Sequence, residues 1–295
     1  MVEPEFGGSW TEAKLERLRT YLRAFMKIFS RNTRAGYYKT VYLDGFAGTG
    51  FRKRKKKSLE GVDVLFDVPR DRDSIEYRKG SAFVALETTP PFDEYVFVER
   101  SGARTRELTK LRSLFPRLSD RISIKTEDAN SFLPRWSAET NWKKTRAVVF
   151  LDPFGMQVEW TTIESIARTK AVDLWLLFPL IAVNRLLLRN RPPEGVMAER
   201  LTRVFGDESW RAAFYTGSRE LGLFEDDPQV LKDTDFRRIS QAWTQKLTSV
   251  FAGVAPNPLP LRNSKNVPIY LLCFAAANPR KAQIAVRIAQ HILSR

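Results

Sequence analysis

The stretch "VYLDGFAGTG", residues 41–50, decides the fold. It begins with a run typical of a β-strand, passes through a carboxylate, and ends in three glycines spaced G-x-x-G-x-G. Glycine admits a positive φ and lets backbone N–H groups approach a ligand closely. Such a turn at the carboxyl end of a first strand is typical of α/β proteins that bind a nucleotide-like cofactor. A turn that binds no ligand is the alternative explanation.

Short apolar runs recur along the chain, and helical patterns lie between several of them. Ser9 and Glu12 form a capping box before a helix whose apolar side is suited to cover a sheet. This alternation of strands and helices predicts a doubly wound, mostly parallel α/β sheet. The predicted strands are 41–43, 95–98, 147–151, 172–178 and 268–276.

Two segments interrupt the alternation. Residues 51–79 are polar, strongly charged and without a clear period, which predicts a lid or binding loop. Residues 185–262 carry helical spacing and end in the proline-rich "APNPLPLRNSKNVP", which predicts a helical insertion. Residues 1–184 and 263–295 would then form the core of the protein.

The chain is strongly basic. Lysine and arginine number 49 against 34 for aspartate and glutamate, so the formal net charge is +15. This excess favours a polyanionic partner, RNA or DNA, over a small neutral metabolite, and a solubilising surface is the alternative. The densest charge is a run of six residues that we expect to contact phosphates: Arg52, Lys53, Arg54, Lys55, Lys56 and Lys57.

The scarcity of histidine and cysteine argues against several classes of enzyme. His291 and Cys273 are the only residues of their types, so a Ser-His-Asp or Cys-His mechanism and a histidine- or thiolate-bound metal are not expected. Cys273 lies in an apolar run and is expected to pack as a small hydrophobic residue. No apolar stretch reaches about 18 residues and no signal peptide is recognisable, so we expect a cytoplasmic protein without a membrane span.

The glycine turn fits no phosphate-binding motif. Gly45 and Gly50 have the spacing of a P-loop, but Phe51 and Arg52 stand where its lysine and hydroxyl residue belong. A dinucleotide fingerprint would need a third glycine at the position of Lys53. A cofactor without phosphates fits better, and S-adenosylmethionine, a nucleoside with an amino-acid end, is such a ligand.

Polar residues follow two further predicted strands. Glu99 ends "EYVFVE", where a carboxylate can accept hydrogen bonds from both hydroxyls of a ribose, and an exposed strand-end charge is the alternative. Asp128 and Asn130 follow the strand-like "ISIK" and could bind an adenine amino group, although both are also good turn and helix-capping residues. The expected cofactor site comprises Asp44, Gly45, Phe46, Gly48, Gly50, Glu99, Asp128 and Asn130.

The stretch "AVVFLDPFGMQVEW", residues 147–160, suggests the reaction. A fully apolar strand delivers Asp152, Pro153 and Phe154 to the same edge as the glycines, and we expect these three residues to form the catalytic edge. In amino-methyltransferases with a D-P-P-[YF] motif, a carboxylate and a backbone carbonyl accept the hydrogens of an exocyclic amine, while an aromatic ring stacks on an extruded base. Here the second proline is absent and the ring comes one position early. The alternative is an aspartate that caps the helix starting near Trp160.

Six motifs occur in a fixed order: "YLDGFAGTG", "GSAFVAL", "FVE", "DAN", "FLDPFG" and "FAAANPRKAQIAVRI". With them the chain resembles the three-Cys-motif partner protein family over most of its length. The resemblance implies a Rossmann-type, S-adenosylmethionine-dependent methyltransferase that works with a separate cysteine-motif partner protein. It also implies a cofactor site around the glycine turn, Glu99 and Asp128, with the catalytic edge at Asp152, Pro153 and Phe154.

Two functions of different classes remain open from the sequence. The first is a methyltransferase that acts on nucleic acid. The second is a methyltransferase-like module that holds nucleic acid or the partner protein without turnover. Binding of S-adenosylmethionine, and exposure of Asp152 to an open pocket, would distinguish the two.

Overall fold

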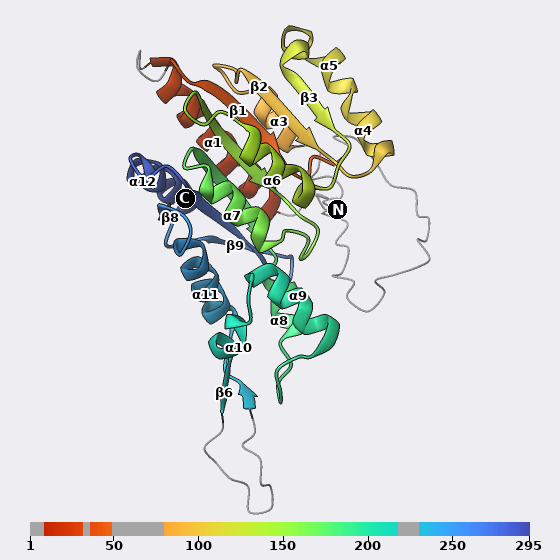
Figure 1. Ribbon diagram of the computed structural model, residues 1–295, viewed down its shortest axis with the longest axis vertical. Coiled ribbons are helices and arrows are strands. Elements are labelled where there is room, and N and C mark those ends of the chain that lie inside the picture. The colour runs from red at the N-terminus through yellow and green to blue at the C-terminus, as the bar shows by residue number, and fades with distance from the viewer. Residues whose placement is uncertain (1–8, 32–35, 49–79, 218–229) are drawn as a thin grey trace, which may run out of the picture.

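The computed structural model describes residues 9–31, 36–48, 80–217 and 230–295. Its centre is an eight-stranded sheet in the order β3-β2-β1-β4-β5-β10-β8, with β9 pairing to β10 (Figure 1). The first five strands of this order run parallel, and β10 runs antiparallel to β5. The bounds are β1 Lys39–Asp44, β2 Glu94–Val98, β3 Ile122–Lys125, β4 Thr145–Leu151, β5 Val172–Phe178, β8 Gly253–Val254, β9 Leu259–Arg262 and β10 Pro268–Ala276.

The predicted doubly wound α/β fold is confirmed, and each predicted strand overlaps an observed one. The sheet is covered on both faces, which is why its strands are apolar throughout rather than alternately polar. Along β1, Val41 and Leu43 face one core, and Tyr42 faces the other. Because side chains alternate along a strand, Asp44 lies on the face of Tyr42.

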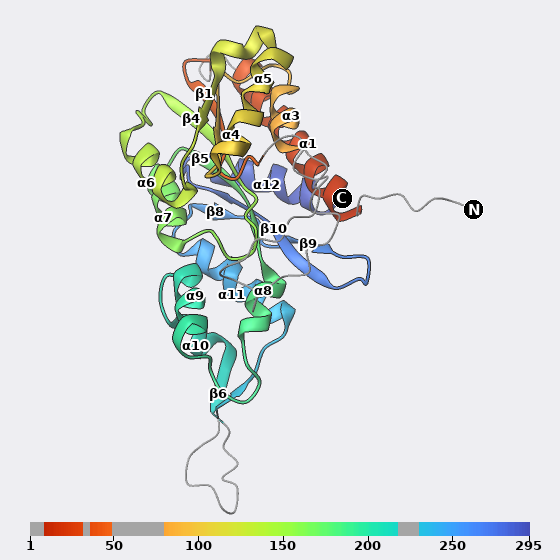
Figure 2. The same ribbon diagram turned by 90° about the vertical axis from the view of Figure 1, so that its right-hand side faces the viewer.

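Helices pack on the two faces in separate groups (Figure 2). The face that carries Tyr42 is covered by α1 Ser9–Arg31, α3 Ser81–Leu86, α12 Ala282–Leu293 and the short helices α4 Gly102–Leu108 and α5 Lys110–Leu114, which the 3-10 helix η3 Pro116–Arg121 follows. The opposite face is covered by α6 Ala129–Glu139, α7 Trp160–Arg168 and α11 Phe236–Thr248. Because the first five strands are parallel, their carboxyl ends lie at one edge, the usual ligand side of such sheets.

The long helix α1 is held by the apolar face that its sequence predicts. Leu18, Leu22 and Phe25 are buried against the sheet. Tyr21 adds a polar contact, since its hydroxyl donates to Asp173 Oδ2 at 2.7 Å near the start of β5. The helix α12, at the other end of the chain, packs beside α1 on the same face.

The segment predicted as a helical insertion is helical only in part. It contains α9 Gly195–Phe205, α10 Ser209–Phe214 and α11, preceded by α8 Leu180–Leu186, and a small antiparallel sheet of β6 Tyr215–Gly217 and β7 Val230–Lys232. β8 and β9 also fall inside residues 185–262, yet both hydrogen-bond to β10 and belong to the central sheet. Among the helices that the structure describes, none is both long enough and apolar enough to cross a membrane.

Candidate functional site

Three carboxylates lie along the carboxyl edge of the sheet. Asp44, the last residue of β1, is paired with Phe97 of β2 and Phe150 of β4. Glu99 and Asp152 each lie two residues beyond those partners, so they share the face of Asp44 as well as its edge. This is the face that α1 covers.

Asp44 is fully buried. Its Oδ1 accepts a hydrogen bond from the N–H of Phe46 at 3.1 Å, and its Oδ2 is buried without a hydrogen-bond partner in the described part of the chain. Burial raises the pKa of Asp44 to about 7; the nearby Ser81 hydroxyl and the hydrogen bond from Phe46 oppose that rise, the charge of Asp152 adds to it, and Lys14 opposes it. A buried carboxylate oxygen without a donor is costly, so it points to a ligand with a donor or a positive charge.

Lys14 and Asp152 form a partly buried ion pair that joins α1 to the end of β4. Lys14 Nζ lies 2.6 Å from Asp152 Oδ2, and the two side chains are 2% and 23% exposed. Sequence reasoning missed Lys14. The signal was present, because Lys14 stands one helical turn before Leu18 on the apolar stripe of α1, where a charge needs a partner.

The glycine turn follows β1 as predicted. Gly48 has φ +65°, the left-handed region that favours glycine. At Gly45 a Cβ atom would lie 2.5 Å from Leu151 Cδ2, so the turn packs tightly against the end of β4. Phe46 is half-buried against the core on the far face of the sheet. Gly50 and the basic run 52–57 lie outside the described residues.

Glu99 occupies the predicted position after β2 and is 8% exposed. Its Oε1 accepts the N–H of Ser101 at 2.9 Å, and Arg104 Nη1 lies 3.6 Å from the same oxygen. The side chain is therefore fixed in a buried position, and the alternative of an exposed strand-end charge does not apply. A carboxylate held in this way could accept hydroxyl groups at the sheet edge.

Asp128 and Asn130 both take part in the start of α6. Asp128 is the N-cap, and its Oδ1 accepts the N–H of Asn130 at 2.8 Å. The side-chain amide of Asn130 donates to the carbonyl of Gln157 at 2.8 Å and accepts the N–H of Glu159 at 3.0 Å. Both polar atoms of that amide thus tie α6 to the segment before α7, the structural alternative that the sequence left open.

The Asp152-Pro153-Phe154 turn lies at the edge as predicted. Glu159 is the N-cap of α7, so the alternative in which Asp152 caps that helix is wrong. The Phe154 ring is 44% exposed, and Gly155 follows with φ +59°. An exposed aromatic ring beside a partly exposed carboxylate is suited to hold a planar polar acceptor.

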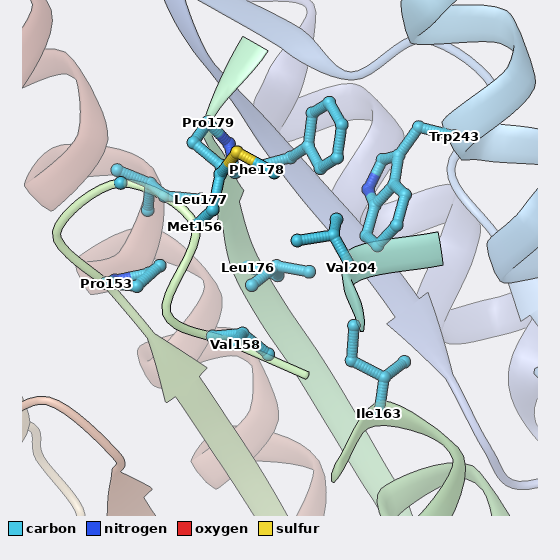
Figure 3. A pocket seen from close by; sticks show the side chains of 11 residues that line it. Pro153, Met156, Val158, Ile163, Leu176, Leu177, Phe178, Pro179, Val204 and Trp243 are labelled. Atoms are coloured by element: carbon cyan, nitrogen blue, oxygen red, sulfur yellow. The ribbon is translucent and has the colours of Figure 1, made fainter. Parts of the chain in front are cut away.

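An apolar hollow lies behind this turn, on the opposite face of the sheet (Figure 3). Pro153 and Met156 form one side, and Phe178, Val204 and Trp243 form the other. Its cavity volume is about 10 Å³, room for about one water molecule. The hollow is therefore a gap in the packing beneath the turn, too small for a nucleoside.

The only cysteine and the only histidine of the sequence lie on other elements, β10 and α12. Cys273 is buried in β10, and burial raises the pKa of its thiol to about 12, so it packs as predicted and is unreactive at neutral pH. His291 is exposed in the last turn of α12. Within the described ranges, no three His, Cys, Asp or Glu side chains gather into a potential metal site.

A mostly parallel sheet in this strand order, with one antiparallel strand beside β5 and acidic residues at the carboxyl edge, is similar to the Rossmann-like methyltransferase fold. No protein-family model and no curated protein matches the chain.

Solved structures similar to the chain include methyltransferases. A DUF519 protein from Legionella pneumophila is 13% identical with a TM-score of 0.48, over 99% of this chain and 93% of that one. The CurJ carbon methyltransferase is 12% identical with a TM-score of 0.41, over 88% of this chain and 54% of that one. Spermidine synthase from Thermotoga maritima is 10% identical with a TM-score of 0.36, over 92% and 60%. These are distant likenesses, and the description of the fold rests on the chain's own strand order.

Proposed function

We propose that the protein is an S-adenosylmethionine-dependent methyltransferase that acts on nucleic acid. The observation that carries the proposal is Asp44, a fully buried carboxylate at the end of β1 whose Oδ2 is without a partner among the described residues. It adjoins a glycine turn and the Lys14–Asp152 ion pair. The residues present fit this cofactor, because its positively charged sulfonium matches an unpartnered buried carboxylate.

When bound, S-adenosylmethionine supplies a methyl group on a positively charged sulfur. The chain's own residues then have binding and orienting roles. The turn at Gly45 and Gly48 gives close backbone approach, and the fixed carboxylate of Glu99 accepts hydroxyl groups. Asp152 accepts a hydrogen of the acceptor and orients it, and the Phe154 ring stacks on the acceptor.

A nucleic-acid acceptor is supported by exposed charge in the segment that follows β5. Arg185, Arg189 and Arg191 follow the carboxyl end of β5 and are exposed. In the part of the chain that the structure describes, no carboxylate forms an ion pair with any of them. Together with the net charge of +15, such arginines favour contacts to phosphates.

Membership in the three-Cys-motif partner protein family, and work with a cysteine-motif partner protein, belong to the same proposal. The six motifs quoted above support it, and "DGFAGTG" and "FLDPFG" are the most specific of them. Co-purification of the tagged chain with a cysteine-motif protein encoded by the same genome would test this part. Repeated purification without such a protein would count against it.

The central test is methyl transfer. We expect the pure protein to transfer labelled methyl groups from S-adenosylmethionine to cellular RNA or DNA, and Asp152→Asn to reduce that rate roughly 10²-fold, the loss seen when a positioned polar group is removed. The cofactor affinity of the variant should hold. If the protein binds nucleic acid but transfers no label to RNA or DNA, the proposal fails in favour of an inactive binding module.

A further inference from the structure

Three charged side chains share one buried corner of the protein. Lys14 pairs with Asp152 at 2.6 Å, and both groups act electrostatically on Asp44, the lysine by attraction and the aspartate by repulsion. One positive charge therefore faces two carboxylates. With both carboxylates ionised, the cluster carries a net charge of −1 in a buried environment, which is unfavourable without a further cation or proton.

The groups around Asp44 leave a proton as the simplest compensation. Lys14 comes from α1, Ser81 from α3, Asp152 from the end of β4, and the buried Tyr42 hydroxyl from β1 itself. Lys14 is the one cation that acts on Asp44 in the described structure, and it is already bound to Asp152. Burial raises the pKa of Asp44 to about 7, so about half of the molecules hold a proton there at neutral pH.

We propose that the Asp44–Lys14–Asp152 cluster senses the charge of the cofactor, binding the sulfonium form with release of a proton and the uncharged sulfide product without one. The inference rests on the proposed function, because it takes S-adenosylmethionine as the ligand of this edge. Its physical basis is the orphaned Oδ2 atom of a buried carboxylate, which a ligand cation can satisfy in place of a proton.

The proposal balances the charge of the reaction. Methyl transfer forms a bond from the lone pair of the acceptor to the methyl carbon, the electron pair of the broken carbon–sulfur bond stays on sulfur, and the acceptor gives up one proton. The positive charge on the sulfur is then gone from the corner. Asp44 can take up the proton that the acceptor lost, so the cluster returns to its resting charge.

Titration calorimetry tests the inference without measuring activity. S-adenosylmethionine and S-adenosylhomocysteine would each be titrated near neutral pH in phosphate and in Tris buffer, whose ionisation enthalpies differ. The difference in heat between buffers counts the protons released. We expect the sulfonium form to release up to about half a proton more than the sulfide at about pH 7, and the excess to vanish near pH 9, where Asp44 is already ionised. Because the sulfonium charge lowers the pKa of the nearby amino group, that pKa would be measured for each free ligand and its share of the proton count subtracted.

Two variants test whether Asp44 is the group that releases the extra proton. Asp44→Asn should abolish the excess. Asp173→Asn is the matched control, because burial also raises the pKa of Asp173, to about 6. This residue lies at the opposite end of the sheet, where it accepts a hydrogen bond from Tyr21. The excess proton release of this variant should equal that of the wild type.

The possible outcomes separate this inference from the proposed function. Equal proton counts for the two ligands in the wild type would overturn the inference and leave the proposed function standing. Failure of both ligands to bind the wild type would overturn both. If Asp44→Asn does not bind, the pH dependence of the excess in the wild type and in Asp173→Asn still decides.

Discussion

Replacing Asp44 by asparagine tests the electrostatics of the site through the stability of the fold. The carboxyl of Asp44 has a pKa of about 7 in the folded protein and an ordinary value of 3.8. A group whose pKa is raised on folding contributes stability that is fully present below the unfolded value and is lost as the pH rises through the folded value. The wild type should therefore gain stability as the pH falls from about 7 toward about 4.

The size of this gain follows from the two pKa values. Each pH unit inside the window is about 1.4 kcal/mol, so between about pH 9 and about pH 5 the protonation of Asp44 stabilises the fold by about 3 kcal/mol. Asp44→Asn lacks this gain. The new amide also buries a donor where Oδ2 has no described partner, which costs about 1–3 kcal/mol, but this cost does not change with pH.

Urea unfolding of both proteins at several pH values from about 5 to about 9 would measure the free energy of unfolding. The difference between wild type and variant should change by about 3 kcal/mol over this range, or on the order of 5 °C in Tm. Other titrating groups, such as Asp173, are common to both proteins and cancel. A difference that stays constant with pH would refute the reasoning, because Asp44 would then titrate in the ordinary range of a carboxylate.

Three further variants test, in turn, cofactor binding, the stability of the fold and the binding of nucleic acid. Gly48→Val places a branched residue at φ +65° and should abolish binding of S-adenosylmethionine. The control Gly195→Val, at φ +53° and remote from the edge, should be destabilised comparably and keep binding; binding by both variants would place the cofactor elsewhere. Lys14→Met leaves Asp152 without its partner and should lower the free energy of unfolding by roughly 2–3 kcal/mol, after allowance for the exposure of Asp152. The control Lys39→Met, whose ion pair with Glu94 is exposed, should cost less than about 1 kcal/mol; equal losses would make the Lys14 pair an ordinary surface contact. A triple serine variant at Arg185, Arg189 and Arg191 should reduce the slope of log K against log salt for nucleic-acid binding by up to about 3. A control with serine at the exposed Lys281, Arg287 and Arg295 of the α12 region should leave that slope nearly unchanged; the opposite ranking would move the interface to α12.

The strands could be predicted because buried parallel strands appear in the sequence as continuous apolar runs, and a glycine turn marks the end of the first one. The sequence places β8 and β9 in the insertion because both are short, β9 lies within a proline-rich stretch and β8 directly precedes it. Pro260 pairs opposite Leu271 at the margin of the sheet, where a missing N–H is tolerated.

The part of the site that lay on strand ends could be predicted, because parallel strands bring their carboxyl ends to one edge. Lys14 could not be matched to its partner, since 138 positions separate it from Asp152 and no local pattern joins them. Asn130 was expected at the cofactor for its chemistry, yet the neighbouring segment before α7 engages both ends of its amide. Propensity and spacing do not show which of two available partners a polar side chain takes.

The place of β10 in the sheet has a consequence for how the protein is made. This strand is the last in the sequence, yet it lies between β5 and β8, and the helix that follows it packs beside α1. During synthesis, β5 and β8 therefore keep an unpaired edge until residues 268–295 have been added, and α1 gains its neighbour α12 only then. A nascent chain that stops before residue 268 would present these unpaired strand edges to other chains.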